Sequence, residues 1–246
     1  MNSDCYEFWL ENLENKECIY SEQSKNKYFE NIKKIYKFKN INLLYQAMQH
    51  PTILTPDLKT LNTNYVNLSY QRPSFLGEAF ISMVVSLWVY RQNPKLSVNE
   101  SLLHKLKICG INHHIISLMS LDLNLDTAII CWNSNLKQDM KKYKQEIEKL
   151  RNNWENRNKI KIEDYEKLDL EFTIILCELF YAYWGAILLD SKNIILPIDM
   201  FILFSKGYLL ANATLDNYRQ HPKVEILELF YQRREILKEI KEKYFF

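Results

Sequence analysis

Residues 70–90, YQRPSFLGEAFISMVVSLWVY, combine a long apolar pattern with a polar face and a glycine. The apolar residues recur every three or four positions, which predicts a helix with one face packed on a core. Pro73 lies near the start of this helix, where a missing backbone N–H is tolerated. Ser74 and Glu78 are one turn apart and therefore share a face. We expect this helix to hold both core and functional side chains.

The composition predicts an all-α fold. Of 246 residues, 47% are hydrophobic and 25% charged, as in an ordinary soluble protein of one large domain or two small ones. Only four glycines and six prolines are available for turns, which is few for a many-stranded sheet. Long windows rich in Leu, Ile, Lys and Glu have the period of helices instead.

Charge and cysteine content exclude several classes of protein. A net charge of +2 is too small to identify a nucleic-acid-binding protein from its overall electrostatics. The five cysteines are odd in number and never form a C-x-x-C pair, so neither a disulfide framework nor a zinc site is indicated. The acidic N-terminus shows no targeting signal. We expect an intracellular protein, nuclear or cytoplasmic rather than mitochondrial.

Residues 172–189, FTIILCELFYAYWGAILL, are long and apolar enough to suggest a short membrane span. Glu178 lies in the middle of this stretch, Asp169 and Asp190 lie close to its ends, and no cluster of Lys or Arg marks a cytoplasmic side. We favour a buried core helix and expect no membrane association.

Two stretches resemble motifs of the RNase III family. Residues 71–79, QRPSFLGEA, resemble the signature E-R-L-E-F-L-G-D-A, and residues 169–191 resemble the motif G-D-x-F-E-A/S-L-x-G-A-I-Y-x-D-S-G. Gly77 and Gly185 fall on the two glycine positions of these motifs. The resemblance covers about residues 38–190 and implies the RNase III-type helical endonuclease fold. It also aligns His50 with a helix end, where we expect a capping or packing residue rather than a ligand.

The family holds Mg²⁺ with four carboxylates, and the resemblance places Ser74, Glu78, Glu178 and Tyr181 at these positions. Serine is short and neutral, and a tyrosine phenol with a pKa near 10 is protonated at neutral pH. We therefore assign no catalytic residue and expect no required cofactor. Residual Mg²⁺ binding is left to Glu78 and Glu178. Completion of the ion's ligand shell by Glu171 is disfavoured, since Glu171 lies two turns, roughly 10 Å, from Glu178.

The resemblance further implies pairing of two domains through the signature helix. In the family, the Phe of F-L-G-D enters a socket on the partner, and Phe75 occupies that position beside Leu76 and Ala79. Phe75 could alternatively fill its own core. We favour a heterodimer with a catalytically competent RNase III-like chain over a homodimer, because a homodimer would lack a working site.

Residues 133–166 are dense in charge and stand where Dicer-type domains have an insertion. They predict either a solvated helix or a face that contacts RNA phosphates. The candidate RNA-binding residues are Lys107, Lys141, Lys142, Lys144 and Arg151. We expect an N-terminal helical extension over 1–37, an RNase III-like domain over 38–220, an amphipathic helix over 221–246, and no double-stranded-RNA-binding domain after it.

The favoured function is that of a noncatalytic dimerisation and double-stranded-RNA-docking subunit of a Dicer-like RNA-processing complex. Two alternatives stay open at this point. One is an active double-strand-specific endoribonuclease, and the other is a structural protein of the mitochondrial large ribosomal subunit.

Overall fold

The computed structural model describes residue 29 and residues 35–53, 69–94, 100–131, 134–152 and 170–214. These residues are helical, apart from loops and one isolated bridge between Gln49 and Ile130. The elements are α3 (Ile41–Ala47), η2 (Pro51–Ile53), α5 (Gln71–Gln92), α6 (Glu100–Gly110), α7 (His113–Asp122), α8 (Leu125–Ala128), α9 (Ser134–Asn152), α11 (Leu170–Ser191) and α12 (Ile195–Asn212). The predicted all-α class is confirmed. Most of the predicted N-terminal extension and the predicted helix over 221–246 lie outside the described residues.

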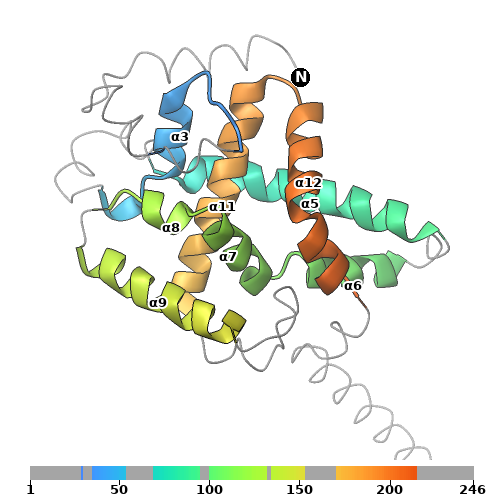
Figure 1. Cartoon of the computed structure of the whole chain (residues 1–246). Coiled ribbons are helices and arrows are strands. Elements are labelled where there is room, and N and C mark those ends of the chain that lie inside the picture. Colours follow the sequence, from blue (N-terminus) through green and yellow to red (C-terminus); the bar gives the residue numbers. More distant parts are fainter. Residues whose placement is uncertain are drawn as a thin grey trace, which may run out of the picture.

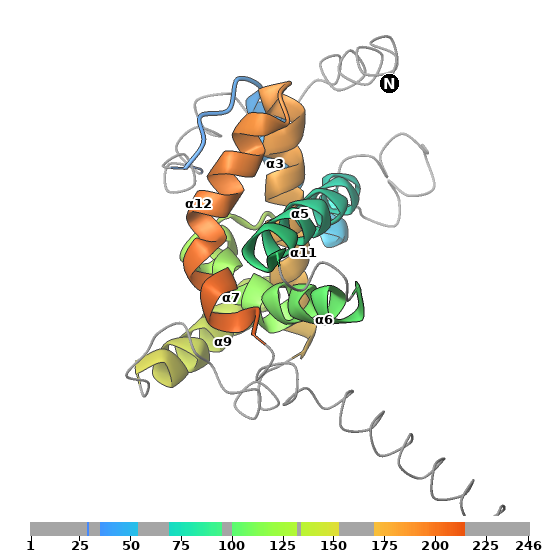
Figure 2. The same ribbon diagram turned by 90° about the vertical axis from the view of Figure 1, so that its right-hand side faces the viewer.

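Helix α11 runs through the middle of the fold, with α5 crossing it and α12 beside it (Figures 1 and 2). Its residues Leu179–Ile187 are all buried, including Trp184 and Tyr183, which are completely inaccessible to solvent. The Trp184 ring packs edge-on against Phe201 of α12 at a centroid distance of 5.1 Å. Phe80 of α5 belongs to the same cluster. The aromatic residues of three helices therefore form the centre of the core.

By length and composition alone, α5, α11 and α12 are each apolar enough to cross a membrane. In α11, 67% of the apolar window is buried inside the fold. This burial agrees with the interpretation of residues 172–189 as a core helix.

Helices α5 and α11 touch through their backbones. A Cβ atom built on Gly77 would lie 1.8 Å from the carbonyl oxygen of Tyr181, and one built on Gly185 would lie 2.0 Å from that of Pro73. Both distances are far below any van der Waals contact, so only glycine fits at either position. The two glycines singled out in the sequence thus fix how closely these helices approach.

The C-terminal end of α11 anchors the chain that leads into α3. Asp190 is buried and accepts hydrogen bonds from the Tyr36 hydroxyl at 2.9 Å and from the backbone N–H groups of Lys39 and Asn40 at 2.8 and 2.7 Å. Asn40 in turn caps α3 by accepting from the N–H of Asn42. Asp190 therefore has a structural role.

His50 lies in the turn that follows α3. Its Nδ1 atom accepts from the backbone N–H of Thr52 at 3.2 Å, and its ring stands edge-on to Tyr70 at 5.5 Å. The backbone N–H of His50 donates to the carbonyl oxygen of Ile130 at 2.9 Å. Partial burial lowers the pKa of the imidazole. These contacts agree with the packing role expected from the sequence.

Candidate functional site

The polar face of the α5–α11 crossing contains a hydrogen bond that joins the start of α5 to α11. The buried Tyr70, the residue just before α5, donates its hydroxyl to Oε2 of Glu178 at 2.6 Å. Burial raises the pKa of the Tyr70 phenol, and the hydrogen bond to Glu178 and the charge of its carboxylate raise it further. The phenol therefore stays protonated and serves as a fixed donor to the half-buried Glu178 carboxylate.

We expect Tyr70→Phe to lower the free energy of unfolding by about 1.5 to 3 kcal/mol, the range for a hydrogen bond to a charged group. The carboxylate of Glu178 would lose its donor while staying half-buried. Urea denaturation measures the change. Tyr90→Phe is the matched control, since Tyr90 is 56% exposed and should change stability by less than about 0.5 kcal/mol. Equal stability of both variants would remove the role assigned to Tyr70.

The other positions of the predicted quartet lie on the same two helices. Ser74 is half-buried and lies one turn after Tyr70 in α5, and Glu78 is exposed one turn further on. Tyr181 is buried on α11, one turn after Glu178. Burial, the neighbouring Cys177 and the Glu78 carboxylate hold the pKa of the Tyr181 phenol well above its usual value near 10. The site thus contains two carboxylates and two protonated tyrosines.

These residues do not fit the Mg²⁺ centre that the family resemblance implies. Mg²⁺ needs hard oxygen ligands in a near-octahedral arrangement. A protonated phenol is a poor ligand, and with a neutral serine at position 74 only Glu78 and Glu178 remain as charged oxygen ligands. Within the described parts of the chain, no three His, Cys, Asp or Glu side chains are grouped so that they could hold a metal ion. The residues at these positions therefore do not form the metal centre of the family.

The side of α5 that faces away from α11 presents an apolar stripe. Phe75 is 77% exposed, and the residues that follow it at turn spacing are exposed as well, namely Ala79, Met83, Leu87 and Tyr90. Leu76 is half-buried. Phe75 therefore does not fill the core of its own domain, which was the alternative left open by the sequence. A continuous exposed apolar stripe is characteristic of an interaction surface.

Comparison with known proteins identifies the domain. Residues 71–192, which include α5 and α11 with the glycine crossing between them, match the family model described as "Ribonuclease III domain". This segment is a ribonuclease III domain. The resemblance recognised from the two motifs is thereby confirmed.

Relatives of the ribonuclease III domain include both Dicer proteins and bacterial enzymes. The chain is 32% identical to Dicer-like protein 1 of Neurospora crassa over 46% of its length and 7% of that protein. It is 24% identical to Endoribonuclease Dicer homolog 2 of Arabidopsis thaliana over 79% of its length and 12% of that protein. Ribonuclease 3 of a Wolbachia species is 31% identical over 40% of each chain. The chain therefore spans well under two thirds of each of these relatives.

A solved structure supports the same fold. The nuclease domain of ribonuclease III from Campylobacter jejuni superposes with a TM-score of 0.51 at 20% identity, covering 73% of this chain and 97% of that one. The predicted RNase III-type helical fold is confirmed.

The described part of the charged insertion is α9, which packs through one face on the rest of the ribonuclease III domain. Met140, Tyr143 and Ile147 are buried, and the Tyr143 hydroxyl lies 2.7 Å from Oγ1 of Thr173 in α11. The opposite face is polar and exposed. This arrangement matches an amphipathic surface helix, one of the two interpretations of the sequence.

The predicted RNA-binding residues differ in their surroundings. Lys141 and Lys142 are exposed on α9, and Lys142 pairs with Asp139 at 2.7 Å. Lys107 is half-buried on α6. Arg151 lies in α9, but its side chain is outside the described part of the structure. Their contact with RNA stays a prediction.

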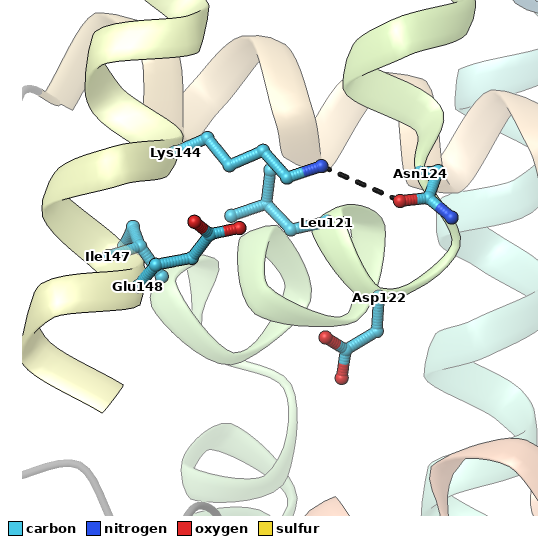
Figure 3. A pocket seen from close by; sticks show the side chains of 6 residues that line it. All are labelled: Leu121, Asp122, Asn124, Lys144, Ile147 and Glu148. Carbon is cyan, nitrogen blue, oxygen red and sulfur yellow. Dashed lines mark hydrogen bonds between the residues drawn. The ribbon is translucent and has the colours of Figure 1, made fainter. Parts of the chain in front are cut away.

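Lys144 is directed into the fold. Its ammonium group lies 3.1 Å from the buried carboxylate of Asp126 and 3.5 Å from Oδ1 of Asn124. It borders a cavity of about 250 Å³ between α7 and α9, whose lining also includes Asp122 and Glu148 (Figure 3). Carboxylates around this cavity would repel a phosphate, so the exposed lysines of α9 are better placed for RNA.

Tyr70 is the residue of this site that the sequence did not reveal. It precedes the signature motif and is separated from Glu178 by 108 positions. An aromatic residue in front of a helix is usually a packing residue, so its role as a donor to a carboxylate had no local signal.

Proposed function

We propose that this ribonuclease III domain is a noncatalytic subunit that pairs with another ribonuclease III-like chain and docks double-stranded RNA in a Dicer-like RNA-processing complex. The noncatalytic assignment depends on the loss of two of the four carboxylates at the quartet positions. The two that remain are Glu78 and Glu178, and Oε2 of Glu178 accepts the Tyr70 hydroxyl. Ser74 and Tyr181 replace the other two with groups that stay neutral at physiological pH.

The Dicer-like assignment is supported by the extent of the similarity. The match to the Arabidopsis Dicer covers 200 residues and therefore extends beyond residues 71–192. The charge-dense α9 also lies where Dicer-type domains are expected to have an insertion. Pairing is supported by the exposed apolar stripe on α5, with Phe75 as its most exposed large side chain. We favour a heterodimer with a catalytically competent chain, since a homodimer would lack a working site.

An active endoribonuclease is the second candidate, favoured by the retention of Glu78 and Glu178 at two quartet positions. Divalent-ion binding separates the two functions. The full chain can be titrated with Mn²⁺ while the electron paramagnetic resonance signal of the free ion is monitored. This titration should show no site with a dissociation constant below the millimolar range. A variant with Ser74→Glu and Tyr181→Glu restores four carboxylates and serves as the comparison. Submillimolar binding by wild type that is lost in Glu178→Gln would favour the active enzyme.

The proposed RNA docking predicts a specific salt response. Binding of a double-stranded RNA should weaken steeply between 50 and 200 mM salt, because released counterions supply most of the affinity. Lys141→Gln with Lys142→Gln should reduce the slope of log K against log salt by up to about 2, roughly one for each lost phosphate contact. Fluorescence anisotropy at several salt concentrations measures this slope.

Lys206→Gln is the control for the lysine variants, because it removes a charge from α12 instead of α9. It should leave the slope unchanged. An affinity independent of salt, or one that depends strongly on RNA sequence, would contradict backbone-directed docking.

A further inference from the structure

Helix α12 has an apolar face that the described residues leave uncovered. Leu196, Leu203 and Leu210 are 46%, 82% and 55% exposed. They follow one another at intervals of seven residues, so they lie almost in line along the helix. The line is about 21 Å long at 1.5 Å per residue. Only 28% of the apolar window of α12 is buried, against 67% for α11.

Gly207 lies on this same face, between Leu203 and Leu210, and is exposed. Glycine inside a helix costs about 1 kcal/mol relative to alanine. At Gly77 and Gly185 the close approach of another backbone explains the glycine. A close-packed element on the outer face of α12 would explain Gly207 in the same way.

The sequence that follows α12 contains a matching apolar line. Phe230, Leu237 and Tyr244 are also spaced by seven residues, within a segment of helical period that begins after Pro222. These residues lie outside the described structure. The two lines have equal length, since each spans 14 positions.

We propose that residues 223–246 form a helix that packs antiparallel on the outer face of α12. Pairing Leu210 with Phe230 places Leu203 opposite Leu237 and Leu196 opposite Tyr244. The same register places Lys241 opposite Asp199, the acidic residue that lies in the apolar line.

The connection is long enough for this pairing. Residues 213–222 separate the end of α12 from the segment, and ten residues can span up to about 33 Å. Tethering through this connection gives the segment a high effective concentration at α12, which favours it over a second copy of the chain. Asp199 within the line disfavours a lipid surface as the occupant. The packing is independent of whether the domain cleaves RNA.

Disulfide trapping in the full chain tests the register. Two cysteines are joined only when their Cα atoms lie within about 7 Å. Leu203→Cys with Leu237→Cys should form an intrachain disulfide in dilute solution at least about five times more efficiently than Leu203→Cys with Glu239→Cys. Glu239 is the control because it lies about 200° around the helix from Leu237. Peptide mapping separates this disulfide from the native cysteines. Equal yields, no disulfide, or one formed only between chains overturns the proposal.

Thiol accessibility provides a second measurement that does not depend on disulfide geometry. Leu203→Cys alone should react slowly with a maleimide, and adding Leu237→Asp should accelerate the reaction about ten-fold by releasing the segment. Glu239→Gln should leave the rate unchanged. Rapid labelling in every variant overturns the proposal. Protection that is insensitive to Leu237→Asp but depends on protein concentration or on phosphatidylcholine vesicles also overturns it, in favour of a second copy or a membrane.

Discussion

Gly77→Ala is expected to destabilise the domain by about 3 kcal/mol or more, enough to unfold much of the protein at physiological temperature. The new methyl group would lie 1.8 Å from the carbonyl oxygen of Tyr181. That oxygen belongs to the backbone of the central helix α11, so it cannot rotate away as a side chain could. The two helices would have to separate, and the aromatic core around Trp184 would lose contact with α5. Urea denaturation followed by circular dichroism measures the loss.

Gly110→Ala provides the matched control for this prediction. Gly110 is also a buried helical glycine, but a Cβ atom there would first meet a methyl group of Leu209 at 3.2 Å. A side-chain methyl can shift by a few tenths of an ångström, so this variant should lose no more than about 1 kcal/mol. Similar losses at Gly77 and Gly110 would show that backbone contact between α5 and α11 does not determine the fold.

Phe75→Ala is expected to weaken pairing by about 2 kcal/mol or more, which corresponds to roughly a 30-fold rise in the dissociation constant. A large aromatic side chain that enters a pocket on a partner loses most of its binding energy when truncated. Because Phe75 is 77% exposed in the single chain, the same variant should leave the stability of the monomer nearly unchanged. Sedimentation velocity of the isolated protein and of its native complex measures the pairing.

Leu170→Ala serves as the control for pairing, since Leu170 is 59% exposed at the start of α11 and does not belong to the α5 stripe. It should pair as wild type does. A Phe75→Ala variant that pairs equally well, or a wild-type protein that stays monomeric in both preparations, contradicts the proposed interface.

The central crossing of the fold could be predicted because its sequence signals are strong. Two of only four glycines fall on the glycine positions of the two motifs, and the structure places both at the backbone contact between α5 and α11. The core role of α11 could also be predicted, since an apolar helix with a central Glu178 and no basic flank fits a protein interior.

Features that depend on tertiary contacts could not be predicted. The sequence places Phe75 on a helix but does not show whether other parts of the domain cover that side of the helix. The structure shows that they do not, since Phe75 is 77% exposed. The sequence does not distinguish Lys141, Lys142 and Lys144, which lie in the same charged segment. In the structure, only Lys144 of these three forms an ion pair with a buried carboxylate, that of Asp126. Such contacts depend on how distant segments pack, and periodicity contains no information about them.

Cleavage of double-stranded RNA in the presence of Mg²⁺ is the most direct measurement of the noncatalytic assignment. The purified full chain should give no products above the background seen with EDTA, because Ser74 and Tyr181 stay neutral and leave only two carboxylates at the quartet positions. Specific Mg²⁺-dependent cleavage that disappears in both Glu78→Ala and Glu178→Ala would contradict the assignment and establish an active nuclease.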